Sequence, residues 1–156
     1  MGFGQPSLKG RALKLLSQRE HSRRELERKL AQHEAEPGQL RQALDDLQAR
    51  GFIDEGRVVE SVLNRRAPRL GAGRIRQELQ AKGLDAERIA RAVAGLRGSE
   101  LARAREVWRK KFDAPPADAA GRAKQARFLA ARGFSGDVIR RVLGGGGDED
   151  LSEDAG

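Results

Sequence analysis

Apolar residues recur along most of this chain at three- and four-residue spacing, which is the period of an amphipathic helix. Leu40, Leu44 and Leu47 form one such stripe, and Ile89 and Val93 belong to another. No segment of useful length alternates apolar and polar residues with the period of two that a half-buried strand requires. The pattern therefore predicts an all-α protein.

The helical pattern repeats along the chain. Residues 78–93 and 128–143 align fifty positions apart, so that Leu79 meets Leu129 and Gly83 meets Gly133. A weaker third copy lies forty-nine positions upstream of the first. Self-similarity at a fixed period is typical of a fold in which one supersecondary unit is stacked on the next. We therefore expect tandem three-helix modules at residues 8–50, 51–97 and 98–143, followed by a disordered Gly-rich and acidic tail at 144–156.

The borders of these modules follow from one recurring group of residues: a base, a glycine and an apolar residue. Such a group is typical of a helix end, where the glycine takes a left-handed conformation and the apolar residue folds back onto the helix. We expect a positive φ at Gly83 and Gly133 for this reason. The three groups are Arg50-Gly51-Phe52, Lys82-Gly83-Leu84 and Arg132-Gly133-Phe134.

Helix starts are marked by short polar side chains that can accept hydrogen bonds from the first-turn amides. Ser22 and Glu25 have the spacing of a capping box. Asp54, Asp85, Ser99 and Ser135 are further expected N-caps. The helices expected between these signals include 55–66, 73–82, 86–96, 120–132 and 136–143.

The apolar stripes of the expected helices predict a lean aliphatic core with a single tryptophan. The expected core residues are Leu16, Leu26, Leu30, Leu44, Val62, Ile75, Leu79, Ile89, Val93, Trp108, Leu129, Ile139 and Val142.

The net charge of +8 is distributed unevenly. Residues 1–56 hold ten Lys and Arg against nine Asp and Glu, whereas residues 57–147 hold 21 against nine. Residues 148–156 hold five acids and no base. The middle of the chain therefore has a positive field that suits nucleic acid or an acidic protein groove. Solvated helix faces on an otherwise inert surface would give the same charge pattern.

Catalytic chemistry is not indicated. Cysteine is absent, and His21 and His33 are the only histidines. Neither histidine has a carboxylate and a nucleophile at a recognised spacing, so His21 is interpreted as a polar residue in a helix connection. No metal or cofactor is expected, and Gly71-Ala72-Gly73 lacks the Lys and Ser or Thr of a phosphate-binding loop. The N-terminal residues contain no signal peptide, which predicts a cytoplasmic protein.

Bases that recur in the last two helices of the second and third modules are the candidate binding residues. Phe128 is added because its helical position indicates exposure; the alternative is that it packs on Trp108 or Phe112. A DNA reader of the helix-turn-helix kind would instead project polar residues from one helix, such as Gln77 or Gln125. The candidates are Arg74, Arg76, Lys82, Arg88, Arg91, Lys124, Arg127, Phe128, Arg132, Arg140 and Arg141.

Five segments in this order resemble the RecX family, bacterial regulators of the RecA recombinase. They are REHSRRELERKL (19–30), GFIDEGR (51–57), GAGRIRQELQAKGLD (71–85), RKKF (109–112) and RFLAARGFSGDVIRRVL (127–143). The resemblance implies tandem three-helix repeats in an elongated, curved molecule. It also implies a protein that lies in the groove of the RecA–single-stranded DNA filament and suppresses ATP hydrolysis, strand exchange and coprotease activity.

The expected partners are therefore the RecA filament and, more weakly, single-stranded and double-stranded DNA, with no membrane and with the chain acting as a monomer. The alternative reading is a stand-alone DNA-binding protein that uses one three-helix module.

Overall fold

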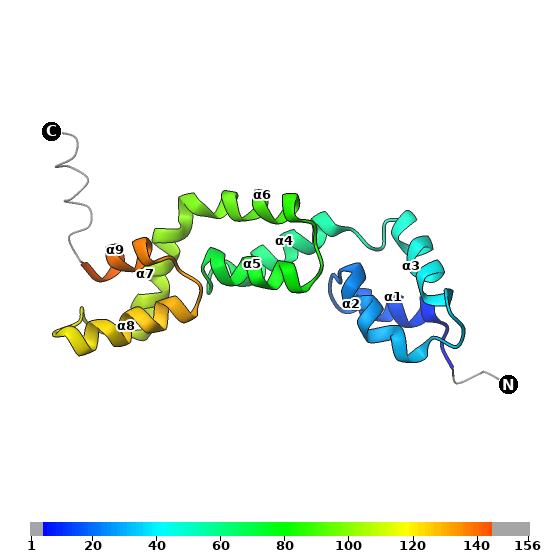
Figure 1. Ribbon diagram of the computed structural model, residues 1–156, viewed down its shortest axis with the longest axis horizontal. Helices are drawn as coiled ribbons and strands as arrows, with labels where there is room; N and C mark the ends of the chain where they lie inside the picture. The colour runs from blue at the N-terminus through cyan, green and yellow to red at the C-terminus, as the bar shows by residue number, and fades with distance from the viewer. Residues whose placement is uncertain (1–4, 145–156) are drawn as a thin grey trace. The chain divides into compact units, whose positions relative to one another are not determined.

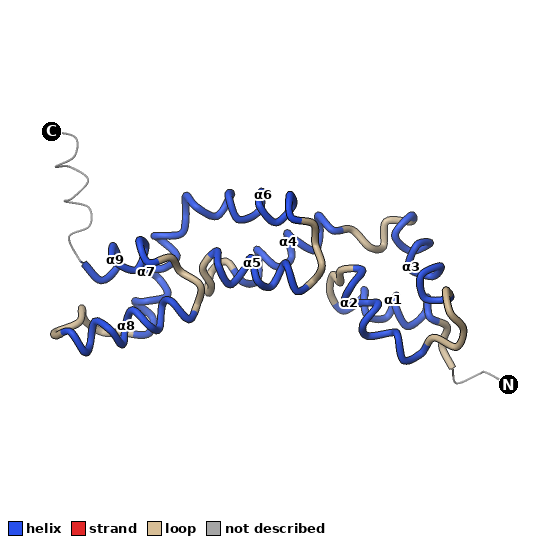
Figure 2. The backbone as a smooth tube through the Cα atoms, viewed as in Figure 1, coloured by secondary structure: helices blue, strands red, loops and turns tan. Residues whose placement is uncertain are grey.

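The computed structural model describes residues 5–144, and within this range every regular element is a helix (Figures 1 and 2). The expected all-α class is confirmed. The α-helices are α1 (Leu8–Gln18), α2 (Arg23–Leu30), α3 (Gln39–Ala49), α4 (Glu55–Arg66), α5 (Ala72–Ala81), α6 (Ala86–Leu96), α7 (Glu100–Lys111), α8 (Ala119–Ala131) and α9 (Gly136–Gly144). Two short 3₁₀ turns, Ala31–His33 and Arg97–Ser99, follow α2 and α6. The tail expected at residues 144–156 lies outside the described residues except for Gly144, which belongs to α9 and not to a tail.

The chain divides into two compact units, and the division runs through α4, α5 and α6. One unit holds the described part of Met1–Ser61 together with Leu79–Ile89. In it, α1, α2 and α3 pack against one another. The buried cluster between these helices is aliphatic and consists of Ala12, Leu26, Leu30, Leu40, Leu44, Leu47 and Ile53.

The other unit holds Val62–Glu78 and the described chain from Ala90 onward. Here α9 packs against both α7 and α8. The buried cluster of Ala104, Leu129, Phe134, Ile139 and Leu143 lies among these helices. Trp108, Phe112 and Phe128 add aromatic surface in the same unit.

Three helices end as the base–glycine–apolar groups predict. Gly51, Gly83 and Gly133 have φ values of 84°, 78° and 93°, so the expected left-handed conformation is confirmed. The residue after each glycine donates its amide to a carbonyl five positions earlier, for example Phe134 N to Leu129 O at 3.3 Å. The fold-back of the third residue fails in one case, because Phe52 is 46% exposed and Ile53 enters the core instead.

Helix starts agree with the expected caps at every position but one. Ser22 and Glu25 form the capping box, in which Ser22 Oγ accepts from Glu25 N and Glu25 Oε1 accepts from Ser22 N. Asp54, Asp85 and Ser135 each accept from the amide three residues later. Ser99 occupies the N-cap position of α7 as expected, but its side chain does not cap the helix: its hydroxyl donates to Leu96 O and accepts from Arg103 Nε.

Ten of the thirteen expected core residues are buried, and Leu16, Trp108 and Val142 are half-buried. These three pack against the edges of the two clusters. Two helices begin and end one residue earlier than expected, at Ala72–Ala81 and Ala119–Ala131. No helix among residues 5–144 is long and apolar enough to cross a membrane.

Candidate functional site

The first turn of α5 is bound by the end of α8 through main-chain groups. Gly71 N donates to Arg132 O at 2.8 Å, and Gly73 N donates to Gly133 O at 3.1 Å. A side chain at Gly71 would lie 2.5 Å from the Gly133 carbonyl, so the two backbones meet only because both residues are glycines. The Gly71-Ala72-Gly73 segment therefore serves helix-to-helix contact.

Two side chains complete this contact. Buried Glu100 accepts from Ala72 N at 2.7 Å, which satisfies another first-turn amide. Arg74 donates from Nη1 to Ala131 O at 2.8 Å. The carboxylate lies at the positive end of the α5 dipole, and the guanidinium lies at the negative end of the α8 dipole.

The end of α5 contacts the start of α2 in a chemically different way. Gly83 lies against the Arg24 side chain. A Cβ added at Gly83 would lie only 2.6 Å from Arg24 Nε. Lys82 forms an ion pair with Glu25, with 3.0 Å between Nζ and Oε1. Arg19 binds the other oxygen of Glu25 at 2.6 Å.

Glu25 is therefore a half-buried carboxylate shared by three donors, with 14% of its side chain exposed. Burial alone would raise its pKa, but hydrogen bonds from Arg19, the Ser22 amide and Lys82 outweigh it and lower the pKa of Glu25 to about 2. The carboxylate is thus held ionised by the chain's own cations.

Several candidate bases are used inside the chain. Lys82 is only 17% exposed in its pair with Glu25, and Arg74 binds the end of α8. Arg88 pairs with Asp85 at 3.4 Å, and Arg140 and Arg141 share Asp137. Because these contacts already use the charge and the hydrogen-bond donors of these bases, less of either is left for a binding partner. The effect is greatest for Lys82.

Four candidates keep their charge free. Arg76 on α5, Arg91 on α6, and Lys124 and Arg127 on α8 are exposed. Within residues 5–144 none of the four has an acidic partner or a side-chain hydrogen bond. All four belong to the unit that contains α7, α8 and α9.

Phe128 is half-buried, and of the two possibilities weighed for it, exposure and packing on an aromatic neighbour, the packing on Phe112 is confirmed. The two rings are 5.2 Å apart in an edge-to-face arrangement at 84°. The Arg132 guanidinium lies 4.4 Å from the Phe128 ring centre, and Lys111 Nζ lies 5.8 Å from it. Both cations therefore lie over the Phe128 ring at distances that allow cation–π attraction.

The helix-turn-helix alternative loses one of its expected reading residues. Gln125 is buried, and it accepts from Trp108 Nε1 at 2.8 Å and donates to Ala114 O at 3.2 Å. Gln77 stays exposed on α5. Gln125 was missed as a core residue because an amide in a basic helix carries no sequence signal of burial.

Arg103 is a structural residue that the charge pattern did not single out. Its guanidinium donates to Ala67 O at 2.8 Å, to Leu70 O at 2.6 Å and to Leu96 O at 3.3 Å. It thereby satisfies carbonyls beyond the end of α4 and at the end of α6. Its position in the first turn of a long basic helix could not distinguish it from exposed arginines.

His21 is buried in the connection between α1 and α2, and the interpretation as a structural histidine is confirmed. Nδ1 donates to Arg19 O at 3.0 Å, which leaves Nε2 to accept from Lys29 Nζ at 3.1 Å. Burial is the main cause that lowers the pKa of His21, and the charges of Arg19 and Lys29 add to it. Among the described residues no cluster of three or more His, Cys, Asp or Glu side chains could hold a metal ion.

Comparison with known proteins agrees with this architecture of three-helix units. Models of the first, second and third three-helix domains of RecX match residues 9–47, 54–93 and 99–143. The regulatory protein RecX of Leptothrix cholodnii is 59% identical over 139 residues, covering 89% of this chain and 88% of that protein. That of Chromobacterium violaceum is 46% identical over 148 residues, covering 95% and 96%.

Solved structures show the same fold at lower identity. The crystal structure of RecX from Lactobacillus salivarius aligns with a TM-score of 0.73 at 21% identity, covering 92% of this chain and 95% of that one. A second crystal structure of a regulatory protein RecX aligns with a TM-score of 0.71, covering 86% and 70%.

The fold and these matches define a regulatory protein, rather than an enzyme, built from three tandem three-helix domains. The chain belongs to the RecX family.

Proposed function

We propose that this chain inhibits the RecA recombinase in the cytoplasm by binding, as a monomer, along the RecA–single-stranded DNA filament. Bound there, it suppresses ATP hydrolysis, strand exchange and coprotease activity, and so regulates DNA repair, recombination and the SOS response. The observation that supports this most directly is the set of exposed bases on α5, α6 and α8 that have no acidic partner among residues 5–144, in a chain of the RecX family.

The free bases suit a surface made of protein carboxylates and DNA phosphates. Arginine binds both groups bidentately, and a base that is not paired within the chain keeps its full charge for a partner. Arg76, Arg91, Lys124 and Arg127 have this property, and we assign them the main role within the proposed modules 51–97 and 98–143. Bases that already have internal partners, such as Lys82, act instead by holding the modules in place.

The test is a titration of this chain into preformed RecA filaments on single-stranded DNA, with ATP hydrolysis as the readout. The variant Arg76→Glu/Arg127→Glu should require at least ten-fold more protein for half-inhibition. The control Arg41→Glu/Arg50→Glu changes the charge equally on exposed residues of α3 and its end, and it should inhibit like the wild type. Equal inhibition by both variants would show that the free bases do not contact the filament.

The same proteins distinguish the alternative function. A stand-alone DNA reader would bind naked duplex tightly with a sequence preference and leave RecA ATP hydrolysis unchanged. For the proposed regulator, binding to naked DNA should be weaker, similar for different sequences and steeply reduced by salt, because it depends on released counterions.

A further inference from the structure

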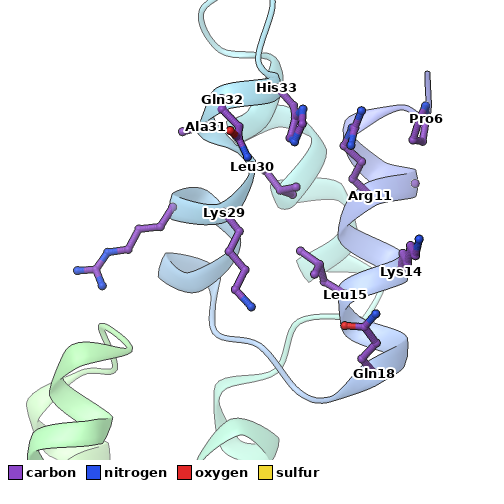
Figure 3. A pocket seen from close by; sticks show the side chains of 12 residues that line it. Pro6, Arg11, Lys14, Leu15, Gln18, Lys29, Leu30, Ala31, Gln32 and His33 are labelled. Carbon is purple, nitrogen blue, oxygen red and sulfur yellow. The ribbon is translucent and has the colours of Figure 1, made fainter. Parts of the chain in front are cut away.

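The first compact unit contains a groove of about 770 Å³ between α1 and the end of α2. This volume lies within the range of about 300–1,000 Å³ that is common for ligand sites. Figure 3 shows Arg11, Lys14, Leu15 and Gln18 of α1 on one side, with Leu30 and His33 opposite them. The lining consists of Pro6, Gly10, Arg11, Lys14, Leu15, Gln18, Arg28, Lys29, Leu30, Ala31, Gln32 and His33.

The lining is strongly basic although the surrounding module is close to neutral. Residues 8–33 hold eight Lys and Arg against three Asp and Glu, whereas residues 34–56 hold two against six. The groove lies in the basic half, and no acidic side chain lines it. The first module is thus nearly neutral in net charge although its groove is lined by basic and not by acidic side chains.

The three acidic residues in the basic half, residues 8–33, each form ion pairs outside the groove. Glu20 pairs with Arg57 at 2.9 Å, Glu27 pairs with Arg23 at 3.2 Å, and Glu25 pairs with Arg19 and Lys82. In the part of the chain that the structure describes, Arg11, Lys14 and Arg28 have no ion pair or side-chain hydrogen bond. Three cations therefore border the groove without an internal counterion.

The groove also has an apolar floor. Leu30 is buried, and Leu15 is half-buried against the aliphatic cluster beneath it. Gln18 and Gln32 add amide groups that can bond to a peptide main chain. The His33 ring is the single aromatic group in the lining, so successive stacked bases have no row of aromatic side chains to lie on.

We propose that this groove binds an acidic peptide segment that has a large apolar side chain between its carboxylates. Arg11, Lys14 and Arg28 pair with the carboxylates, and the apolar side chain contacts Leu15 and Leu30. A phosphate backbone satisfies the cations but leaves the apolar floor unused, which is why a peptide is favoured over nucleic acid. This site goes beyond the proposed function and does not rest on it, because it lies in the first module and uses different residues.

The test measures fluorescence anisotropy of labelled peptides with the full chain. The peptide EDLEEDLE has the proposed chemistry, and EDSEEDSE has the same charge without the apolar side chains. The variant Arg11→Ala/Lys14→Ala should raise the Kd for EDLEEDLE at least ten-fold. Its control, Arg41→Ala/Arg50→Ala, removes two exposed charges outside the groove and should change the Kd less than two-fold.

Each outcome decides the proposal. Binding of EDSEEDSE at least ten-fold weaker than EDLEEDLE supports it, whereas equal binding of the two peptides shows that the apolar floor is not used. Equal losses in both protein variants indicate attraction by net charge alone and overturn it. The proposal is also overturned if EDLEEDLE does not bind. It is overturned as well if the Arg11→Ala/Lys14→Ala variant binds labelled oligothymidylate more weakly than the wild type does but binds the peptide equally well.

Discussion

Removal of the charge on Glu25 should destabilise the contact between α2 and the end of α5. The carboxylate receives Arg19 at 2.6 Å, Lys82 at 3.0 Å and the Ser22 amide at 3.0 Å. The lowering of its pKa from 4.5 to about 2 corresponds to about 3.5 kcal/mol, at about 1.4 kcal/mol for each pKa unit. Glutamine keeps the acceptor for Ser22 but loses both charge-assisted pairs, so we expect Glu25→Gln to cost about 2–3 kcal/mol at neutral pH.

The pH dependence gives a second measure of the same contact. Because the folded pKa is lowered, the stabilisation is present above pH 4.5 and is lost as the pH falls towards 2. In urea unfolding, the wild type should lose about 2 kcal/mol through this group between pH 7 and about pH 3. Glu25→Gln should lack that part of the loss.

The matched control is Glu27→Gln on the same helix. Glu27 is 52% exposed, and within the described residues its carboxylate pairs with Arg23 alone, so its replacement should change the free energy of unfolding by less than about 0.5 kcal/mol. The reasoning is refuted if Glu25→Gln unfolds within about 0.5 kcal/mol of the wild type at pH 7. It is also refuted if both variants lose as much stability in acid as the wild type.

Three further predictions concern stability. His21→Asn keeps a donor to Arg19 O but cannot be protonated, so the loss of wild-type stability as the pH falls below 6.5 should diminish in this variant and persist in His33→Asn. Gly133→Ala places a Cβ 2.6 Å from Arg74 Cγ at a φ of 93° and should cost at least about 2 kcal/mol in urea unfolding, unless the contact with α5 opens freely. Gly95→Ala, which meets nothing within 4 Å inside α6, should instead stabilise the chain by about 0.5–1 kcal/mol, and a loss there would contradict the helix assignment.

The local parts of the fold were predictable because they depend on neighbours in sequence. The left-handed conformation of Gly83 and Gly133 follows from the residues around each one. The capping box of Ser22 and Glu25 is equally local. Phe52 was mispredicted because its fold-back depends on space in the core, which Ile53 occupies.

The candidate site was less predictable because the role of a base depends on what faces it in space. Lys82 and Arg132 align in the repeat, yet one pairs with Glu25 and the other lies on the Phe128 ring. The repeat indicates that both positions are basic, but it does not reveal that Arg74 binds a helix end while Arg76, two residues on, is free. The basic groove was missed because charge summed over a module hides its separation into two halves.

The two ends of α5 are attached by different chemistry, and they should therefore respond differently to solution conditions. At its start, Gly71 and Gly73 bond to neutral main-chain carbonyls just beyond α8. These two bonds involve no titrating side chain, and Glu100 adds a third bond to Ala72 N. At its end, Lys82 depends on an ionised Glu25, which acid neutralises and concentrated salt weakens. Acid near pH 2 should then free the end of α5 from α2 while its start stays attached to α8, so the chain should come apart in a fixed order rather than all at once.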